Sequence, residues 1–73
     1  MTRLGEYLAK RAINRAAVSR RSGISKTRLS ELSNNPTTKL RADELYLIAL
    51  AIEAKPCDLL EYVCFDVALL PTG

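Results

Sequence analysis

The sequence predicts an all-α fold, a single domain of five short helices. Leu, Ile, Val and Ala supply most of the apolar residues, there is no Trp, and only 5% of residues are aromatic, a composition suited to helices. Apolar residues recur at helical spacing, and capping residues, Gly and Pro interrupt them at short intervals. With 73 residues, the simplest organisation is one domain over residues 1–64 and an apolar tail over 65–73.

The first helix is expected over residues 2–11. Thr2 suits its N-cap, because a threonine hydroxyl accepts a hydrogen bond from a free amide of the first turn. Leu4 and Leu8, with Ala12 just beyond the end, recur at intervals of four. This spacing places them on one inner face.

A tight turn is predicted between the second and third helices. Asn14 is a good N-cap for a second helix over 15–22, and Ser25 for a third helix over 26–33. Gly23 stands at the end of the second helix, where a left-handed backbone is common and a side chain is disfavoured. Two helices joined by so short a turn must cross steeply, which is the geometry of a helix-turn-helix.

The composition of the third helix suits contact with DNA. Apolar residues stand where the two helices would meet, namely Val18, Ile24, Leu29 and Leu32, with Ile24 filling the inside of the turn. The outer face of the third helix is then polar. Polar side chains of this kind contact base edges and phosphates, and an α-helix fits the major groove.

Two more helices are expected towards the C-terminus. The third helix should stop at Asn34-Asn35-Pro36, because Asn tolerates left-handed geometry and Pro cannot continue a helix. The fourth helix is predicted over 42–54, and Lys55-Pro56 ends it. The proline suits the first turn of a fifth helix over 56–63.

Charge is divided unevenly along the chain. Residues 1–41 hold ten Lys or Arg and two Glu, a net charge of +8, whereas residues 42–73 hold one Lys and six Asp or Glu, a net charge of −5. A basic N-terminal part suits a polyanionic partner. Solvated surface charge without any partner is the alternative.

The segments "INRAAVSRRSGIS", "KTRLSELSNN" and "ADELYLIALAIEAKPCDLLEYV" together resemble the lambda repressor/Cro-like DNA-binding domains. The helix-turn-helix itself corresponds to residues 15–34, and the five-helix order to about residues 4–63. The resemblance implies a compact five-helix DNA-binding domain with the helix-turn-helix at helices 2 and 3.

The resemblance also implies contact residues. By position, base contacts fall on Lys26, Thr27 and Glu31, and Ser30 shares their outer face. Phosphate contacts are expected at Arg15, Arg28, Asn34, Lys39 and Arg41. Each could instead be solvated surface, which is the simpler interpretation of Arg20 and Arg21. Glu31 could also pair with Arg28, three residues before it on the same helix.

The chain departs from the family pattern at four positions. Arg15 stands where Gln is common, and could contact a phosphate with a full charge. Ser19 replaces the usual small Ala, and its hydroxyl could bond back to its own helix. Ser22 replaces an apolar residue, so the second helix should pack less well. Asn35 stands where Gly is common.

A second apolar stripe marks the fourth helix. This stripe consists of Leu47 and Leu50, at positions that are usually polar in the family. The tail adds further apolar residues, namely Phe65, Val67, Leu69 and Leu70. We expect this stripe and tail to form a homodimer interface, because such domains bind two half-sites related by two-fold symmetry. Alternatively, the tail folds back on the fourth helix of its own chain.

The function expected is a sequence-specific double-stranded DNA-binding transcriptional regulator, a repressor acting by promoter occlusion. Alternatives are an antitoxin that binds both DNA and a protein toxin, a protein-interaction module on the same fold, and a non-specific nucleoid binder. An enzyme, a cofactor and a metal site are not expected, because the chain has no His, and Cys57 and Cys64 lack metal-ligand spacing. No membrane segment is expected, and the two reduced cysteines suggest a cytoplasmic protein.

Overall fold

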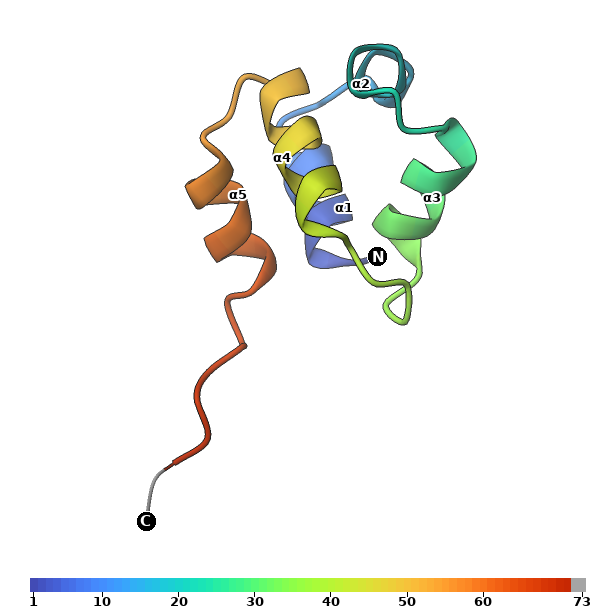
Figure 1. Cartoon of the computed structure of the whole chain (residues 1–73). Coiled ribbons are helices and arrows are strands. Elements are labelled where there is room, and N and C mark those ends of the chain that lie inside the picture. The colour runs from blue at the N-terminus through green and yellow to red at the C-terminus, as the bar shows by residue number, and fades with distance from the viewer. Residues whose placement is uncertain (72–73) are drawn as a thin grey trace.

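The computed structural model describes residues 1–71 and confirms the five-helix, all-α fold. Its helices are α1 (Arg3–Lys10), α2 (Arg15–Ser22), α3 (Lys26–Asn34), α4 (Ala42–Ala51) and α5 (Pro56–Val63). No strand occurs among these described residues. Figure 1 shows α1 and α4 in the middle of the domain, with α3 on one flank, α5 on the other and α2 across one end.

Each helix contributes at least one residue to the core. Leu8 of α1, Val18 of α2, Leu29 of α3, Ile48 of α4 and Leu59 of α5 are at most 2% exposed. Burial of a side chain of this size stabilises the fold by about 1.5–3 kcal/mol. The helix pairs that pack together are α2 with α4, α1 with α3, α1 with α5, α4 with α5 and α2 with α3.

Helix α1 begins at the predicted N-cap. The hydroxyl of Thr2 accepts a hydrogen bond from the amide of Gly5 at 3.1 Å. Leu4 and Leu8 are buried as expected, but Ala12 is exposed in the structure, so its predicted place on the inner face is wrong. Its backbone has a φ of 52°, which turns the chain away after the helix. Tyr7, not predicted to be buried, is only 6% exposed.

Helix α4 is shorter than the predicted range 42–54. It ends at Ala51, and Glu53 has a left-handed φ of 59°. The amide of Ala54 then donates to the carbonyl of Ala49 at 2.9 Å, a bond that closes the helix end. Sequence periodicity missed this ending because no glycine marks it.

Helix α3 ends one residue later than predicted, at Asn34. The expected left-handed Asn is absent: Asn35 is extended, with a φ of −103°. An extended residue is what a following proline favours. The side-chain oxygen of Asn35 also accepts from the amide of Thr37 at 3.0 Å, so both residues contribute to the turn that follows the helix.

The start of the tail is held against α1. The guanidinium carbon of Arg3 lies 3.9 Å from the ring centroid of Tyr62 and 3.8 Å from that of Phe65. Its Nε donates to the carbonyl of Tyr62 at 3.1 Å. Beyond this point the described tail extends away from the helices and does not fold back on α4 (Figure 1). The tail was predicted to run to residue 73, and its last two residues, 72–73, lie outside the described residues.

Across residues 1–71, no helix is long and apolar enough to cross a membrane. The same part of the chain holds no cluster of three His, Cys, Asp or Glu side chains arranged to bind a metal ion. Cys57 and Cys64 are free thiols, the first exposed and the second half-buried.

Candidate nucleic-acid interface

The turn between α2 and α3 has the predicted backbone. Gly23 ends α2 with φ 80° and ψ 0°, and its amide donates to the carbonyl of Ser19 at 3.0 Å. A Cβ at this glycine would meet no atom within 4 Å, so the glycine is needed for its backbone conformation rather than for space. Ile24 is 8% exposed and fills the inside of the turn as expected.

Two serines support this turn. The hydroxyl of Ser19 donates to the carbonyl of Ile24 at 2.6 Å, across the turn, so the expected bond back to its own helix is not made. The hydroxyl of Ser22 donates to the carbonyl of Val18 at 2.6 Å and accepts from the amide of Ile24 at 3.2 Å. From the sequence, Ser22 was expected to weaken the packing of the second helix. In the structure its hydroxyl makes two hydrogen bonds at the point where the chain reverses.

Each helix of the motif has the predicted N-cap. The side-chain oxygen of Asn14 accepts from the amides of Ala16 and Ala17, at 2.9 and 3.2 Å. The hydroxyl of Ser25 accepts from the amide of Arg28 at 3.1 Å. These caps fix where α2 and α3 begin, and thus which side chains of α3 face outward.

The outer face of α3 is polar and open to solvent. Leu29 and Leu32 are buried, as is Ser33, which the apolar pattern did not indicate. The residues expected to contact bases, Lys26, Thr27, Ser30 and Glu31, are all exposed. Their spacing places them on one side of the helix. The structure therefore brings the four together on one accessible surface.

The residues expected to contact phosphates come from the segments that precede and follow this face in the chain. Arg15 is half-buried at the start of α2, and Lys39 and Arg41 are exposed in the connection before α4. The Nη2 of Arg41 is 3.3 Å from a carboxylate oxygen of Asp43, an exposed pair that contributes little stability. Asn34 is exposed, but its side-chain amide donates to the carbonyl of Ser30 at 3.0 Å.

Arg28 forms an ion pair with another residue of the same chain. Its Nε and Nη2 donate to the two carboxylate oxygens of Glu44, at 2.8 and 2.9 Å. This hydrogen bonding holds the pKa of the Glu44 carboxyl below its usual value although burial opposes the shift, and it raises the pKa of Arg28. Arg28 is thus bonded to Glu44 rather than to Glu31, the partner considered from the sequence.

Two residues have roles that the sequence did not reveal. Arg21, interpreted as surface, donates from Nη1 to the carbonyl of Ala51 at 2.7 Å and so caps the end of α4. Glu44 accepts from the amide of Arg41 at 3.0 Å, which caps the start of α4. In a sequence, an acidic residue at the third helical position indicates such a cap when the N-cap residue is Ser or Thr, whereas the N-cap residue here is Arg41.

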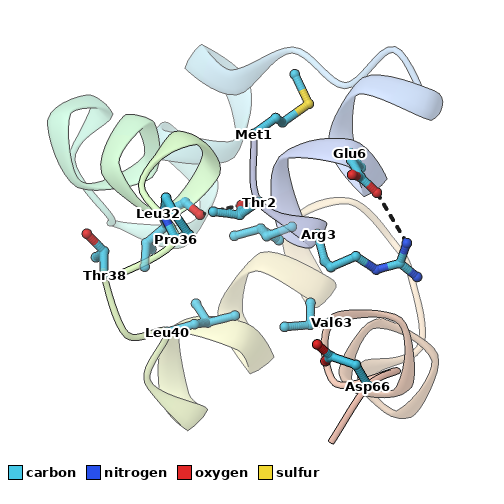
Figure 2. Close-up of a pocket in the computed structure, with 11 residues that line it drawn as sticks. Met1, Thr2, Arg3, Glu6, Leu32, Pro36, Thr38, Leu40, Val63 and Asp66 are labelled. Carbon is cyan, nitrogen blue, oxygen red and sulfur yellow. Dashed lines mark hydrogen bonds and ion pairs between the residues drawn. The ribbon is translucent and has the colours of Figure 1, made fainter.

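The N-terminal residues contact the end of α3. The hydroxyl of Thr2 donates to the carbonyl of Leu32 at 2.7 Å, and the amide of Thr2 donates to the carbonyl of Ser33 at 2.9 Å. Figure 2 shows Thr2 beside Leu32, in the lining of a hollow of about 440 Å³. Because Leu32 belongs to the buried face of α3, this hollow lies behind the helix and not on its polar outer face.

The predicted apolar surface is exposed. Leu47 and Leu50 of α4 are 38% and 50% exposed, and the tail residues Phe65, Val67, Leu69 and Leu70 range from 61% to 96%. Tyr46 and Leu60, which were not predicted to belong to this surface, are also about half exposed, at 54% and 50%. The α4 residues and the tail residues are therefore exposed apolar groups on separate segments, and exposed apolar groups of this kind are typical of interaction surfaces.

Comparison with known proteins identifies the family. Residues 3–64 match the family described as the Cro/C1-type HTH DNA-binding domain. The uncharacterized HTH-type transcriptional regulator YozG of Bacillus subtilis (strain 168) is 40% identical over 55 residues, which span 75% of this chain and 66% of that protein, just under two thirds of its length. No solved structure matches the chain. The match over most of the chain, together with the helix-turn-helix geometry, shows that the chain belongs to the Cro/C1-type helix-turn-helix DNA-binding domain family.

Proposed function

We propose that this protein is a sequence-specific regulator of transcription that represses by occupying a promoter as a homodimer. The observation that carries the proposal is the turn at Gly23, which leaves the polar face of α3 open to solvent. A helix exposed in this way fits the major groove of duplex DNA. The name of the Bacillus subtilis relative, a transcriptional regulator, supports the same function.

Base recognition is assigned to the outer face of α3. Lys26 has the side-chain chemistry to donate to the O6 and N7 acceptors of guanine, and Glu31 to accept from the amino group of cytosine. Thr27 and Ser30 suit either hydrogen bonds or contact with a thymine methyl group. Glu31 is exposed rather than bonded to Arg28, so it is free to act in this way.

Phosphate contacts are assigned to residues that precede and follow that face in the chain. Arg15 lies at the start of α2, Asn34 at the end of α3, and Lys39 and Arg41 in the connection that follows. Each cation that neutralises a phosphate releases a counterion, so affinity should fall with salt with a slope of about −0.9 per contact. Arg28, also expected at a phosphate, is bonded to Glu44, and its role is considered below.

A second copy of the chain is proposed to cover the apolar surface of α4 and the tail. Leu47, Leu50, Phe65, Val67 and Leu69 form the expected interface. Support comes from their exposure and from the two-fold arrangement of half-sites, about 34 Å apart, that domains of this kind recognise. Repression then requires no further activity, because a dimer bound across a promoter excludes other proteins.

Selection of bound duplexes from a random pool tests the proposal directly. We expect an enriched motif of two related half-sites whose centres are about 10 base pairs apart. The enriched sequence, here termed the selected duplex, is then compared with a scrambled duplex of the same length. Binding without enrichment would indicate a non-specific binder, and absence of binding would indicate a protein-interaction module.

An antitoxin is the alternative supported by one observation, the exposed apolar tail. A tail that extends from the domain could contact a toxin as well as a second copy. Co-purification of a small toxic partner that binds through residues 65–71 would favour the antitoxin. A purified protein that is a dimer and represses without any other protein would favour the homodimeric repressor.

A further inference from the structure

Arg28 and Glu44 join two helices whose backbones lie well apart. The Cα atoms of α3 and α4 stay more than 8 Å apart, because α3 packs on α1 and α2. The two bonds from the guanidinium of Arg28 to the carboxylate of Glu44 span this gap. Paired bonds between a guanidinium and a carboxylate fix orientation as well as distance.

The same two side chains also hold the connection between the helices. The Nη2 of Arg28 donates to the carbonyl of Lys39 at 3.1 Å. A carboxylate oxygen of Glu44 accepts from the amide of Arg41 at 3.0 Å. The connection is therefore bonded to both helices, at Lys39 to the guanidinium of Arg28 on α3 and at Arg41 to the carboxylate of Glu44 on α4.

The burial of Glu44 makes its carboxylate dependent on Arg28. The side chain of Glu44 is 11% exposed, and that of Arg28 is 32% exposed. A carboxylate so nearly buried is costly without a cation and hydrogen-bond donors. Arg28 supplies both, so moving its guanidinium to a phosphate would leave Glu44 without its main partner.

We propose that Arg28 is a positioning residue, which sets the orientation of the base-reading helix relative to the phosphate-contacting residues Lys39 and Arg41. This inference rests on the proposed DNA-binding function. Through Glu44, the guanidinium keeps the outer face of α3 and the connection before α4 in one fixed arrangement. Base contacts and phosphate contacts are then made together without rearrangement of the protein.

The alternative is that Arg28 contacts a phosphate, and the two roles predict opposite effects of Glu44→Gln. If Arg28 contacts a phosphate, this change releases the guanidinium and removes a negative charge near the DNA, so binding tightens. If Arg28 is a positioning residue, the change loosens α3 and weakens binding to the selected duplex. Arg28→Lys distinguishes them further, because lysine keeps the charge but loses the paired geometry.

The experiment measures dissociation constants for the selected and scrambled duplexes over a range of salt concentrations. For Glu44→Gln and for Arg28→Lys, we expect affinity for the selected duplex to fall about tenfold, comparable to one impaired base contact. The scrambled duplex should be affected less, so the specificity ratio falls while the salt slope is unchanged. Partial unfolding would reduce binding of both duplexes alike and would leave that ratio unchanged.

Tighter binding by Glu44→Gln, or a salt slope reduced by about one in Arg28→Ala, would overturn the positioning role. The double variant Arg28→Ala/Glu44→Gln should bind no more weakly than Arg28→Ala alone, since both changes break one interaction. Additive losses would contradict the proposal. Arg20→Ala, which removes an exposed arginine of α2, is the matched control for loss of one positive charge.

A measurement without DNA separates this inference from the proposed function. In the free protein, the Nε proton of Arg28 should give a distinct, slowly exchanging NMR signal that Glu44→Gln abolishes and Glu61→Gln leaves in place. Absence of that signal would overturn the inference even if the protein binds the selected duplex. A protein that shows the signal but binds no duplex would overturn the proposed function and, with it, the positioning role.

Discussion

Gly23 and Gly5 are both required, for different physical reasons. Gly23 has a left-handed backbone and open space around it. Gly5 has an ordinary helical backbone, but a Cβ there would collide with the carbonyl oxygen of Ser33, which accepts the amide of Thr2. The sequence indicates the first requirement, because Gly between two capped helices signals a turn. It gives no indication of the second, which arises from the close approach of α1 and α3.

Alanine substitutions at the two glycines should therefore differ. Gly23→Ala should lower the free energy of unfolding by about 1–2 kcal/mol, the cost of a left-handed backbone in a residue with a Cβ. Gly23→Asn should cost less, since asparagine tolerates this conformation. Gly5→Ala should cost about 1–3 kcal/mol through overpacking, and asparagine there should be worse, not better. Urea denaturation measures all four variants, and a milder effect of asparagine at position 5 would contradict this explanation.

Lys26 and Arg15 should respond differently to truncation if their proposed roles are correct. Lys26→Ala should cost about 1–3 kcal/mol on the selected duplex and relax the preference at one base pair. Arg15→Ala should weaken selected and scrambled duplexes to a similar extent and reduce the salt slope by about one. Fluorescence anisotropy titrations measure both effects. Equal losses on both duplexes for Lys26→Ala would favour non-specific binding.

At the scale of the helices, the sequence predicted beginnings better than ends. Helices α2, α3, α4 and α5 begin at the predicted residues, and three of these starts carry local signals that act within one turn, namely Asn14, Ser25 and Pro56. Helix α4 ends at Ala51 rather than at 54, α1 at Lys10 rather than at 11, and α3 at Asn34 rather than at 33. Just beyond α1 and α4, Ala12 and Glu53 adopt left-handed backbones that their residue types do not favour. In each case the next amide bonds back into the helix, Ile13 to the carbonyl of Leu8 and Ala54 to that of Ala49, and the residue types give no sign of this ending.

The pair of Arg28 and Glu44 shows the same limit for the candidate site. The outward face of α3 followed from helical spacing, but the partner of Arg28 lies on another helix, 16 residues along the chain. Sequence proximity suggested Glu31, on the same helix. The structure shows that the carboxylate of Glu44, at the start of α4, accepts hydrogen bonds from two guanidinium nitrogens of Arg28.

Stability should depend on pH through Glu44. Because its pKa is lowered in the folded protein, chiefly by the bond from Arg28, the carboxylate stabilises the fold above its unfolded pKa of about 4.3. This contribution is lost as the pH falls through the lower, folded value. Glu44→Gln should therefore cost about 1 kcal/mol at pH 7, through weakened charge-assisted hydrogen bonds, and much less at pH 2–3.

Urea denaturation at both pH values tests this dependence. Glu61→Gln, which removes an exposed negative charge from α5, controls for the change in net charge. A difference between Glu44→Gln and the unaltered protein that is as large at low pH as at neutral pH would show that packing of the side chain, and not its charge, is responsible.

At the scale of the whole molecule, the exposed apolar surface predicts association. The double variant Leu47→Asp/Leu50→Asp should convert a dimer to a monomer and weaken binding to the selected duplex, because each aspartate would bury a charge at the interface. Light scattering at tens of micromolar measures the mass without DNA. A monomeric unaltered protein would refute the homodimer, and a variant that remains dimeric would show that the stripe of α4 is not the interface.

The opposite placement of α3 and α5 has a kinetic consequence. Basic residues gather in α2, α3 and the connection after them, whereas α5 carries the exposed Asp58 and Glu61 on the far flank (Figure 1). We expect a molecule polarised in this way to be turned by the field of a polyanion during diffusion, so that it meets a duplex with α3, the proposed reading helix, facing the DNA. Added salt should therefore lower the association rate constant, because more collisions would bring α5 rather than α3 against the duplex.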